Sequence, residues 1–404
     1  MAVGLTEPTG ILPVAGIELA ACTAGLYNKE RLDLALIALS DRAVTSAVFT
    51  RNLFCAAPVQ VAKQHLHTSR PSYLIINAGN ANAGTGEQGI NDALEVCRVL
   101  AETANCPVTT VLPFSTGVIG EYLPVNKIQV KIPELLASQD RDNWLPVARS
   151  IMTTDTVVKA VSRQLEIEGQ PVTITGIAKG AGMIRPDMAT MLAFIATDIK
   201  IEQELLDRIV SEAVKYSFNR ISVDGDTSTN DACVVVATGK GRCDVKPEDS
   251  SHSAVKQLIT EVCIELAQAI VRDGEGATKF ITVEIGGGRN KQECLQAAYA
   301  IANSPLVKTA FFASDPNWGR ILAAIGRAGI HSLDISAVSI FLDNVCIVEQ
   351  GMRSPGYSED AGVKVMQQDE ILIRVNLGRG QASETIWTCD LSHEYVRINA
   401  EYRT

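Results

Sequence analysis

The alternation of short apolar runs with amphipathic segments most constrains how this chain can fold. Residues 73–76 and 231–238 are mostly apolar and rich in β-branched side chains, which is typical of buried strands. Residues 201–218 and 253–271 instead place their apolar side chains at helical spacing. Strands that alternate with helices in this way predict an α/β (α+β) protein whose sheets are covered by helices.

The same patterns locate further elements. We expect strands at residues 73–76, 108–112, 171–177, 191–197, 231–238, 280–285, 336–342, 370–376, 383–388 and 395–399. We expect helices at residues 90–104, 201–218, 253–271 and, as a crossover, near 320–329. The run Gly286-Gly-Gly288 predicts a boundary between a larger domain, 1–285, and a smaller C-terminal α/β domain, 286–404.

Composition narrows the class of protein. Hydrophobic residues make up 46% of the 404 residues, so a large core is feasible, and the net charge of −10 argues against a general nucleic-acid binder. No apolar run is long enough to span a bilayer, and residues 1–16 lack the basic residue of a secretory signal. The ten cysteines form no C-x-x-C pair, which favours free thiols and a cytoplasmic protein.

Two local motifs have a functional and a simpler interpretation. His65-x-His67 could supply two metal ligands from one strand face, but no further ligand motif accompanies it, so we interpret it as a polar patch before a turn and expect no metal. The segment 84–89 (GTGEQG) fits a dinucleotide-binding signature, which would suggest a nicotinamide-dependent dehydrogenase. Its glycines begin eight residues after the strand, and the next strand lacks the ribose-binding acid, so a surface loop is the better interpretation.

The densest motif is residues 179–192 (KGAGMIRPDMATML). From the residues alone, this is a glycine-rich loop that enters a strand. A functional interpretation requires cleavage of the Ala189–Thr190 bond, which would give Thr190 a free α-amine. An α-amine has a pKa of about 7.7–8 and can act as the base that activates the threonine hydroxyl for acyl transfer.

Residues 179–192 resemble the signature of the ornithine acetyltransferase family, also called glutamate N-acetyltransferase. The resemblance extends over essentially the whole chain. Matching segments are 48–52 (VFTRN), 77–83 (NAGNANA), 115–120 (STGVIG), 152–156 (MTTDT), 218–227 (FNRISVDGDT), 272–279 (RDGEGATK), 315–320 (DPNWGR) and 395–404 (YVRINAEYRT). The chain departs from the family's common residues at Ala83-Gly84 and before Asp315, outside the expected nucleophile and oxyanion hole.

The resemblance implies a fold and a maturation step. The fold is an αββα sandwich core, shared with N-terminal-nucleophile aminopeptidases of the DmpA type, plus a smaller α/β domain. Family members cleave themselves before the threonine, which here would give an α chain, 1–189, and a β chain, 190–404. The two chains are expected to stay together as an α2β2 heterotetramer.

The reaction implied by the resemblance is ping-pong acetyl transfer in arginine biosynthesis. Thr190 takes the acetyl group from N2-acetylornithine, ornithine leaves, and glutamate then accepts the acetyl group as N-acetylglutamate. No cofactor is implied, and the resemblance leaves open whether acetyl-CoA is a second acetyl donor. The expected partners are these small substrates and a second copy of the protein, with no nucleic acid or membrane.

The resemblance also implies roles for individual residues. Thr116 and Gly117 would form the oxyanion hole that each tetrahedral intermediate needs. Lys179 would bind the substrate α-carboxylate and Glu275 the ornithine ammonium. Thr153 (or the adjacent Thr154), Asn399 and Thr404 would complete the substrate contacts.

Three other functions predict different behaviour. An amidase or aminopeptidase with the same Thr190 nucleophile would use water as its acceptor and release acetate. A dehydrogenase would bind NAD, stay uncut and be indifferent to Thr190→Ala. A structural or interaction protein would show neither cleavage nor turnover.

Overall fold

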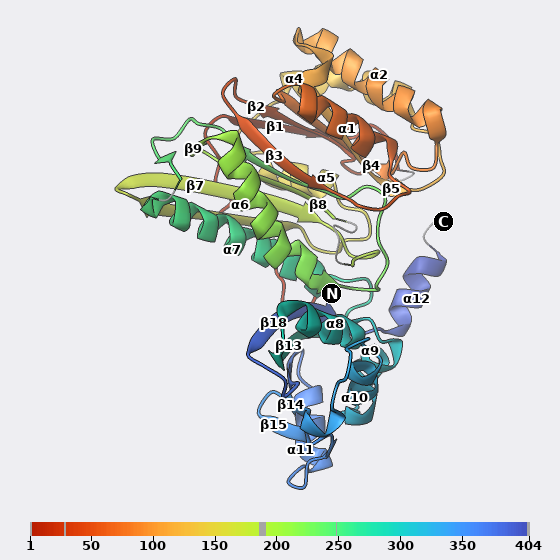
Figure 1. Cartoon of the computed structure of the whole chain (residues 1–404). Helices are drawn as coiled ribbons and strands as arrows, with labels where there is room; N and C mark the ends of the chain where they lie inside the picture. Colours follow the sequence, from red (N-terminus) through yellow and green to blue (C-terminus); the bar gives the residue numbers. More distant parts are fainter. Residues whose placement is uncertain (1, 28–29, 186–190, 248, 402–404) are drawn as a thin grey trace.

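The computed structural model describes residues 2–27, 30–185, 191–247 and 249–401. Two sheets stack face to face, and helices cover both outer faces, so the expected αββα sandwich is confirmed (Figure 1). A further sheet with its own helices, coloured blue, is built mainly from the C-terminal part of the chain. No helix within the described ranges is both long and apolar enough to cross a membrane.

The first sheet of the sandwich has the strand order β1-β2-β4-β5, in which β4 and β5 run parallel. Its strands are β1 (Ile17–Cys22), β2 (Leu34–Leu39), β4 (Tyr73–Asn80) and β5 (Val111–Val118). The helices on this side of the sandwich are α1 (Ala57–Thr68), α2 (Gly86–Ala104), α3 (Val125–Gln129) and α4 (Ile132–Ala137). Of the predicted strand 108–112, only the last two residues belong to β5, because Val108–Thr110 forms a turn of 3₁₀ helix.

The second sheet has the strand order β3-β11-β8-β7-β6. Its strands are β3 (Val44–Phe49), β6 (Lys159–Ile167), β7 (Gln170–Lys179), β8 (Leu192–Thr197) and β11 (Ala232–Ala237). Helices α6 (Gln203–Tyr216) and α7 (Ser250–Arg272) cover its outer face (Figure 1). The short strands β9 (Lys200–Ile201) and β12 (Asp244–Val245) pair beside it.

The core of the sandwich explains why β8 and β11 appear as continuous apolar runs in the sequence. Phe194 and Val234 face the space between the sheets, whereas Ile195 and Val235 face α6 and α7. Strands buried on both faces need apolar residues at every position. Phe194 meets Phe114 of β5 edge to face, at 5.1 Å between ring centroids, and this contact joins the two sheets. Helix α5 (Trp144–Ser150) contributes Trp144 to the same core.

The third sheet has the order β10-β18-β13-β17-β14-β15-β16. Its strands are β10 (Ile221–Ser222), β13 (Phe280–Gly288), β14 (Ser339–Leu342), β15 (Val345–Glu349), β16 (Met352–Arg353), β17 (Glu370–Asn376) and β18 (Ala382–Cys389). Its helices are α8 (Lys291–Ala302), α9 (Pro305–Phe312), α10 (Trp318–Gly326) and α11 (Glu359–Met366). Strand β13 runs across the predicted boundary at 285/286, which stays a prediction.

One predicted strand is wrong. Residues 395–399 belong to a helix, α12 (His393–Ala400), at the C-terminal end of the chain (Figure 1). The Ser392 hydroxyl accepts a hydrogen bond from the Glu394 N–H and so caps the start of this helix. Tyr395 and Val396 favour strands by themselves, but local propensity is a weak signal, and here the capped helix is the conformation that forms.

The packing of α7 on β7 gives a test of this core. Gly176 of β7 has no side chain, which allows Leu266 of α7 to lie close to the strand. Leu266 is fully buried. We expect Leu266→Ala to cost about 2–5 kcal/mol of unfolding free energy, because it leaves a cavity under α7. Leu165→Ala is the control, since Leu165 is 46% exposed; equal shifts of the thermal midpoint in both variants would contradict the packing.

Candidate active site

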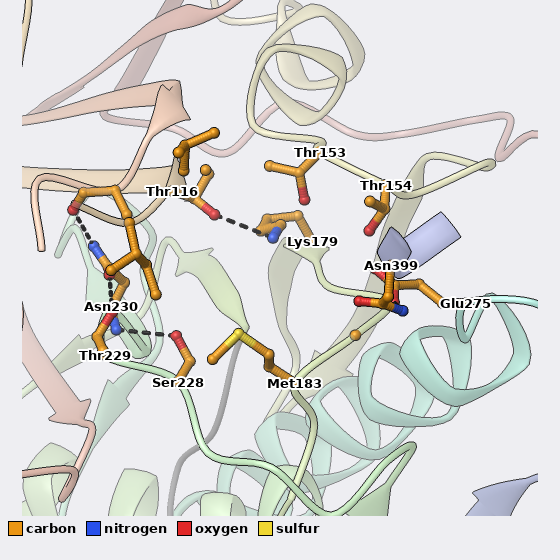
Figure 2. Close-up of a pocket in the computed structure, with 15 residues that line it drawn as sticks. Thr116, Thr153, Thr154, Lys179, Met183, Ser228, Thr229, Asn230, Glu275 and Asn399 are labelled. Atoms are coloured by element: carbon orange, nitrogen blue, oxygen red, sulfur yellow. Dashed lines mark hydrogen bonds between the residues drawn. The ribbon is translucent and has the colours of Figure 1, made fainter. Parts of the chain in front are cut away.

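A cavity of about 250 Å³ opens where loops and strand ends of the sandwich meet (Figure 2). Its wall is built from β5, β7, α12 and the segments that precede β6, β11 and β13. Mostly small and polar side chains line it: Ala81, Thr116, Gly117, Val118, Ile119, Thr153, Thr154, Lys179, Gly182, Met183, Ser228, Thr229, Asn230, Glu275 and Asn399.

Six residues predicted from the sequence lie together in this wall: Thr116, Gly117, Thr153, Lys179, Glu275 and Asn399. Thr154 also lines the cavity, so the choice between it and Thr153 stays open. Ala189, Thr190 and Thr404 lie outside the described residues. The next described residue, Met191, donates its N–H to the Asp231 carboxylate at 2.9 Å and leads directly into β8.

Lys179 and Thr116 form the polar centre of the cavity. Lys179 is the last residue of β7 and Thr116 lies in β5, and the Lys179 Nζ donates to the Thr116 Oγ1 at 3.2 Å. Lys179 is only 3% exposed, and this burial lowers the pKa of its ammonium group. Because an ammonium has no acceptor, it uses a lone pair of the Thr116 oxygen and leaves the hydroxyl hydrogen free to donate elsewhere.

Gly117 follows Thr116 at a point where two backbones almost touch. Its φ of +134° lies in a region that favours glycine, and a Cβ on it would lie 2.3 Å from the carbonyl carbon of Gly79 in β4. Gly79 and Gly117 are register partners in the parallel pair β4–β5. A side chain at residue 117 would therefore separate the strand ends that shape this side of the cavity.

Glu275 and Asn399 form a second polar pair, beside Thr154 in Figure 2. Glu275 follows α7, and its Oε2 accepts a hydrogen bond from the Asn399 Nδ2 at 2.7 Å. The carboxylate lies directly against Gly182, where a Cβ would come within 2.5 Å of it. Asn399 reaches the site from the helix α12 rather than from the predicted terminal strand.

Three residues that line the cavity were not predicted from the sequence: Ser228, Thr229 and Asn230. The Asn230 Nδ2 donates to the carbonyl oxygens of Ala81, at 2.7 Å, and Ser115, at 2.9 Å. It thereby fixes the backbone next to Thr116 (Figure 2). The available signal was a run of polar residues directly after the matched segment 218–227 and directly before the buried strand β11.

Asp224 within that matched segment anchors the chain that enters the cavity from β7. Its carboxylate accepts the N–H groups of Met183, at 2.6 Å, and Ile184, at 3.0 Å. The Tyr395 hydroxyl of α12 donates to the same carboxylate at 3.3 Å. Burial raises the pKa of Asp224. The loop after Lys179 and the helix that holds Asn399 therefore share one anchor.

Neither the segment 84–89 nor the pair His65 and His67 lines the cavity. Of the segment 84–89, predicted as a loop, only Gly84 and Thr85 lie in the loop between β4 and α2, whereas residues 86–89 form the first turn of α2. The Asn82 Nδ2 donates to the carbonyl oxygen of Gly89. His65 and His67 lie on the helix α1 and not on a strand. His65 is buried, with its Nδ1 2.7 Å from the carbonyl oxygen of Val111, whereas His67 is exposed.

Two glycine variants test the close approach at the oxyanion-hole candidate. We expect Gly117→Ala to lower the thermal midpoint and to distort the cavity, because its Cβ would overlap Gly79. Gly120→Ala is the matched control: its φ of +88° is also positive, but nothing lies within 4 Å of its Cβ. Differential scanning fluorimetry that gave equal shifts for both variants would show that φ strain alone determines the effect.

Comparison with known proteins gives the family. The ArgJ family model matches residues 18–404. The chain is 53% identical over 406 residues to the arginine biosynthesis bifunctional protein ArgJ of Pseudomonas fluorescens, and 51% identical over 407 residues to that of Psychrobacter arcticus, with both chains fully covered in each case. The crystal structure of ArgJ from Bacillus halodurans matches with a TM-score of 0.50 and 40% identity, over 52% of this chain and 99% of that one. The chain therefore belongs to the ArgJ family.

Proposed function

We propose that this protein is an acyltransferase of arginine biosynthesis that moves an acetyl group from N2-acetylornithine to glutamate. One observation carries the proposal: six residues from separate parts of the chain, to each of which the resemblance gives a role in the reaction, line a single cavity. The names of the curated relatives support the pathway. The cavity supports the reaction, because it combines a hydroxyl donor, a buried cation and a carboxylate.

The proposed acetyl transfer has two steps. The Thr190 Oγ attacks the acetyl carbonyl carbon of acetylornithine, its proton passes to the Thr190 α-amine, and the C–N bond breaks as that proton moves to the leaving amine of ornithine. The amine of glutamate then attacks the resulting ester, the C–O bond breaks, and Thr190 regains its proton. Each tetrahedral oxyanion needs preorganised donors, and the Thr116 hydroxyl and the Gly117 N–H are the candidates.

The charges of the cavity fit a substrate with two charged ends. Lys179 and Glu275 lie in different parts of the wall (Figure 2), and each is hydrogen-bonded to a neutral side chain. The Lys179 ammonium can therefore pair with the α-carboxylate of the substrate, and the Glu275 carboxylate with the side-chain ammonium of ornithine.

We also propose cleavage between Ala189 and Thr190. Strands β7 and β8 lie on either side of this bond in sequence and are antiparallel neighbours, with Lys179 opposite Leu192. A cut would thus leave two chains joined by strand pairing and by a shared core. The matched Bacillus halodurans chain is covered to 99% by 52% of this chain. Its length is therefore that expected for one of two such chains.

The assembly and location are further proposals. We propose an α2β2 heterotetramer in the cytoplasm, without a metal or a cofactor. All ten cysteines are free in the structure, which supports a reducing compartment.

An intact mass spectrum under denaturing conditions tests the cleavage. We expect two chains of about 20 and 23 kDa, in proportion to residues 1–189 and 190–404, because only a free Thr190 amine supplies the base. Thr190→Ala should stay uncut and inactive, and Thr190→Ser should keep part of both properties. Normal turnover by an uncut Thr190→Ala protein would disprove the nucleophile.

The acceptor distinguishes the transferase from an amidase. With acetylornithine and glutamate, we expect N-acetylglutamate to form in step with ornithine. Release of acetate at the same rate without glutamate would instead identify water as the acceptor. The same assay with acetyl-CoA in place of acetylornithine tests a second acetyl donor.

Glu275→Gln tests the ammonium subsite. The variant keeps the shape of the side chain and an oxygen for Asn399 but removes the negative charge. We expect KM for acetylornithine to rise at least about tenfold, because a charge-assisted contact is lost, while cleavage before Thr190 continues. Failure of cleavage in this variant would show that Glu275 acts in maturation instead.

A further inference from the structure

A cluster of buried charges lies just behind the cavity wall and does not line the cavity. The Lys159 Nζ donates to the Asp155 Oδ1 and the Asp273 Oδ2, each at 2.6 Å, and to the carbonyl oxygen of Val157 at 3.4 Å. The side chains of all three charged residues are at most 1% exposed. An ammonium has three donors, so three acceptors satisfy it fully.

Asp155 connects this cluster to two parts of the cavity wall. Its Oδ2 accepts the N–H of Thr153 at 3.0 Å, and its Oδ1 accepts the N–H of Gly180 at 2.7 Å. Gly180 directly follows Lys179. One carboxylate therefore holds the backbone of a predicted substrate contact and the backbone next to the cavity's ammonium.

Asp273 connects the cluster to a third part. Its carboxylate accepts the N–H of Thr156 at 2.9 Å and the hydroxyl of the same residue at 2.5 Å. Two residues further along the chain is Glu275, whose N–H donates to the carbonyl oxygen of Ala181 at 2.8 Å. The segments that position Thr153, Lys179 and Glu275 are thus tied together around Lys159.

The charges of the cluster balance that of Lys179. Asp155, Asp273 and Lys159 together have a net charge of −1, and Lys179 adds +1. Burial alone would raise the pKa of Asp155, but the charges of Lys159 and Lys179 hold it below its usual value. Burial alone would lower the pKa of Lys159, but Asp155 and Asp273 hold it above its usual value. Asp155 and Lys159 are therefore ionised at neutral pH.

Four charged groups act on Lys179 from the elements around it. Asp155, Asp231 and Glu275 favour its protonated form, and Lys159 opposes it. Asp155 is the strongest of these. Asp155 also accepts the Gly180 N–H, so one side chain both fixes the backbone next to Lys179 and provides the strongest opposite charge near it.

We propose that Asp155 is a positioning residue for acetyl transfer, which holds the backbone of Thr153 and of Gly180, next to Lys179, and so places a buried negative charge behind the cavity wall. Lys159 and Asp273 hold Asp155 in place. This inference rests on the proposed function, because it needs the reaction as its readout. It assigns to Asp155 no contact with the substrate.

Asp155→Asn removes the negative charge of this side chain but keeps its shape and one oxygen that can accept a hydrogen bond. If a protonated Lys179 is required, activity falls as the pH rises through the Lys179 pKa. Without the Asp155 charge, we expect this alkaline limb of the kcat/KM profile for acetylornithine to move to lower pH by at least about one unit. Rates are referred to the amount of cleaved protein in the intact mass spectrum. A profile that is only scaled down, with its limb unmoved, would overturn the charge role.

Glu384→Gln is the matched control. Glu384 forms a buried ion pair with Arg220, at 3.0 Å, with both side chains 6% exposed and outside the cavity. We expect this variant to lose stability while its alkaline limb stays in place. A limb that moved as far as in Asp155→Asn would show that the loss of any buried charge produces the effect.

Two further variants separate charge from position. Lys159→Met makes the cluster more negative, so its limb should stay in place or move to higher pH; a move to lower pH would overturn the proposal. Thr156→Val keeps every charge but removes the hydroxyl that binds Asp273, so KM should rise at least about threefold with the limb unmoved. An unchanged KM would overturn the positioning role, and this mild change serves even if Asp155→Asn does not fold.

Wild-type protein separates this inference from the proposed function. If it makes no N-acetylglutamate from acetylornithine and glutamate, the proposed function fails and the assignment of Asp155 fails with it. If it does make N-acetylglutamate and Asp155→Asn behaves as wild type, only the role of Asp155 is wrong.

Discussion

The antiparallel pairing of β7 with β8 is the interaction on which the site depends. The pair is buried on both faces, between the sandwich core and α7, so its position in the molecule is strongly fixed. Lys179 is the last residue of β7 and lies opposite Leu192, at the end of these two strands that meets the cavity. The sandwich thus brings Lys179 and Leu192, the two ends of the segment 179–192, to one place.

The sequence predicts best the parts of the fold whose pattern reports burial directly. Residues 232–237 and 191–196 are apolar throughout because both faces of β11 and β8 are covered. The helices α6 and α7 show a stripe because only one of their faces is covered. Segments fixed by a few contacts with distant parts of the chain are harder to predict. The helix α12 is capped by Ser392 and held by hydrogen bonds from Tyr395 and Asn399, and no periodicity in residues 395–399 reveals it.

The site is predictable only in part, for a related reason. By local pattern, Lys179 and Glu275 would be exposed loop charges, yet they are 3% and 8% exposed. Their partners are distant in sequence: Thr116 lies 63 residues from Lys179, and Asn399 lies 124 residues from Glu275, so no short window of sequence contains either pair. The family resemblance supplied these positions. Asp155 lies in the matched segment 152–156, but neither the pattern nor the resemblance gave a role to it or to Lys159, behind the cavity wall.

The buried charges in the cavity wall differ from those elsewhere in the molecule in the hydrogen-bond partners that they have. Outside the cavity, the ammonium of Lys159 and the guanidinium of Arg220 each lie directly on carboxylates. Inside it, the hydrogen bonds that Lys179 and Glu275 make to described side chains are to the neutral groups of Thr116 and Asn399. Asp155 partly offsets the charge of Lys179 from behind the wall, but a buried charge whose direct hydrogen-bond partners are neutral still gains from a directly bound group of opposite charge. The proposed substrate would supply such groups with its carboxylate and its ammonium, which is a physical reason to expect that the cavity selects a doubly charged amino-acid derivative.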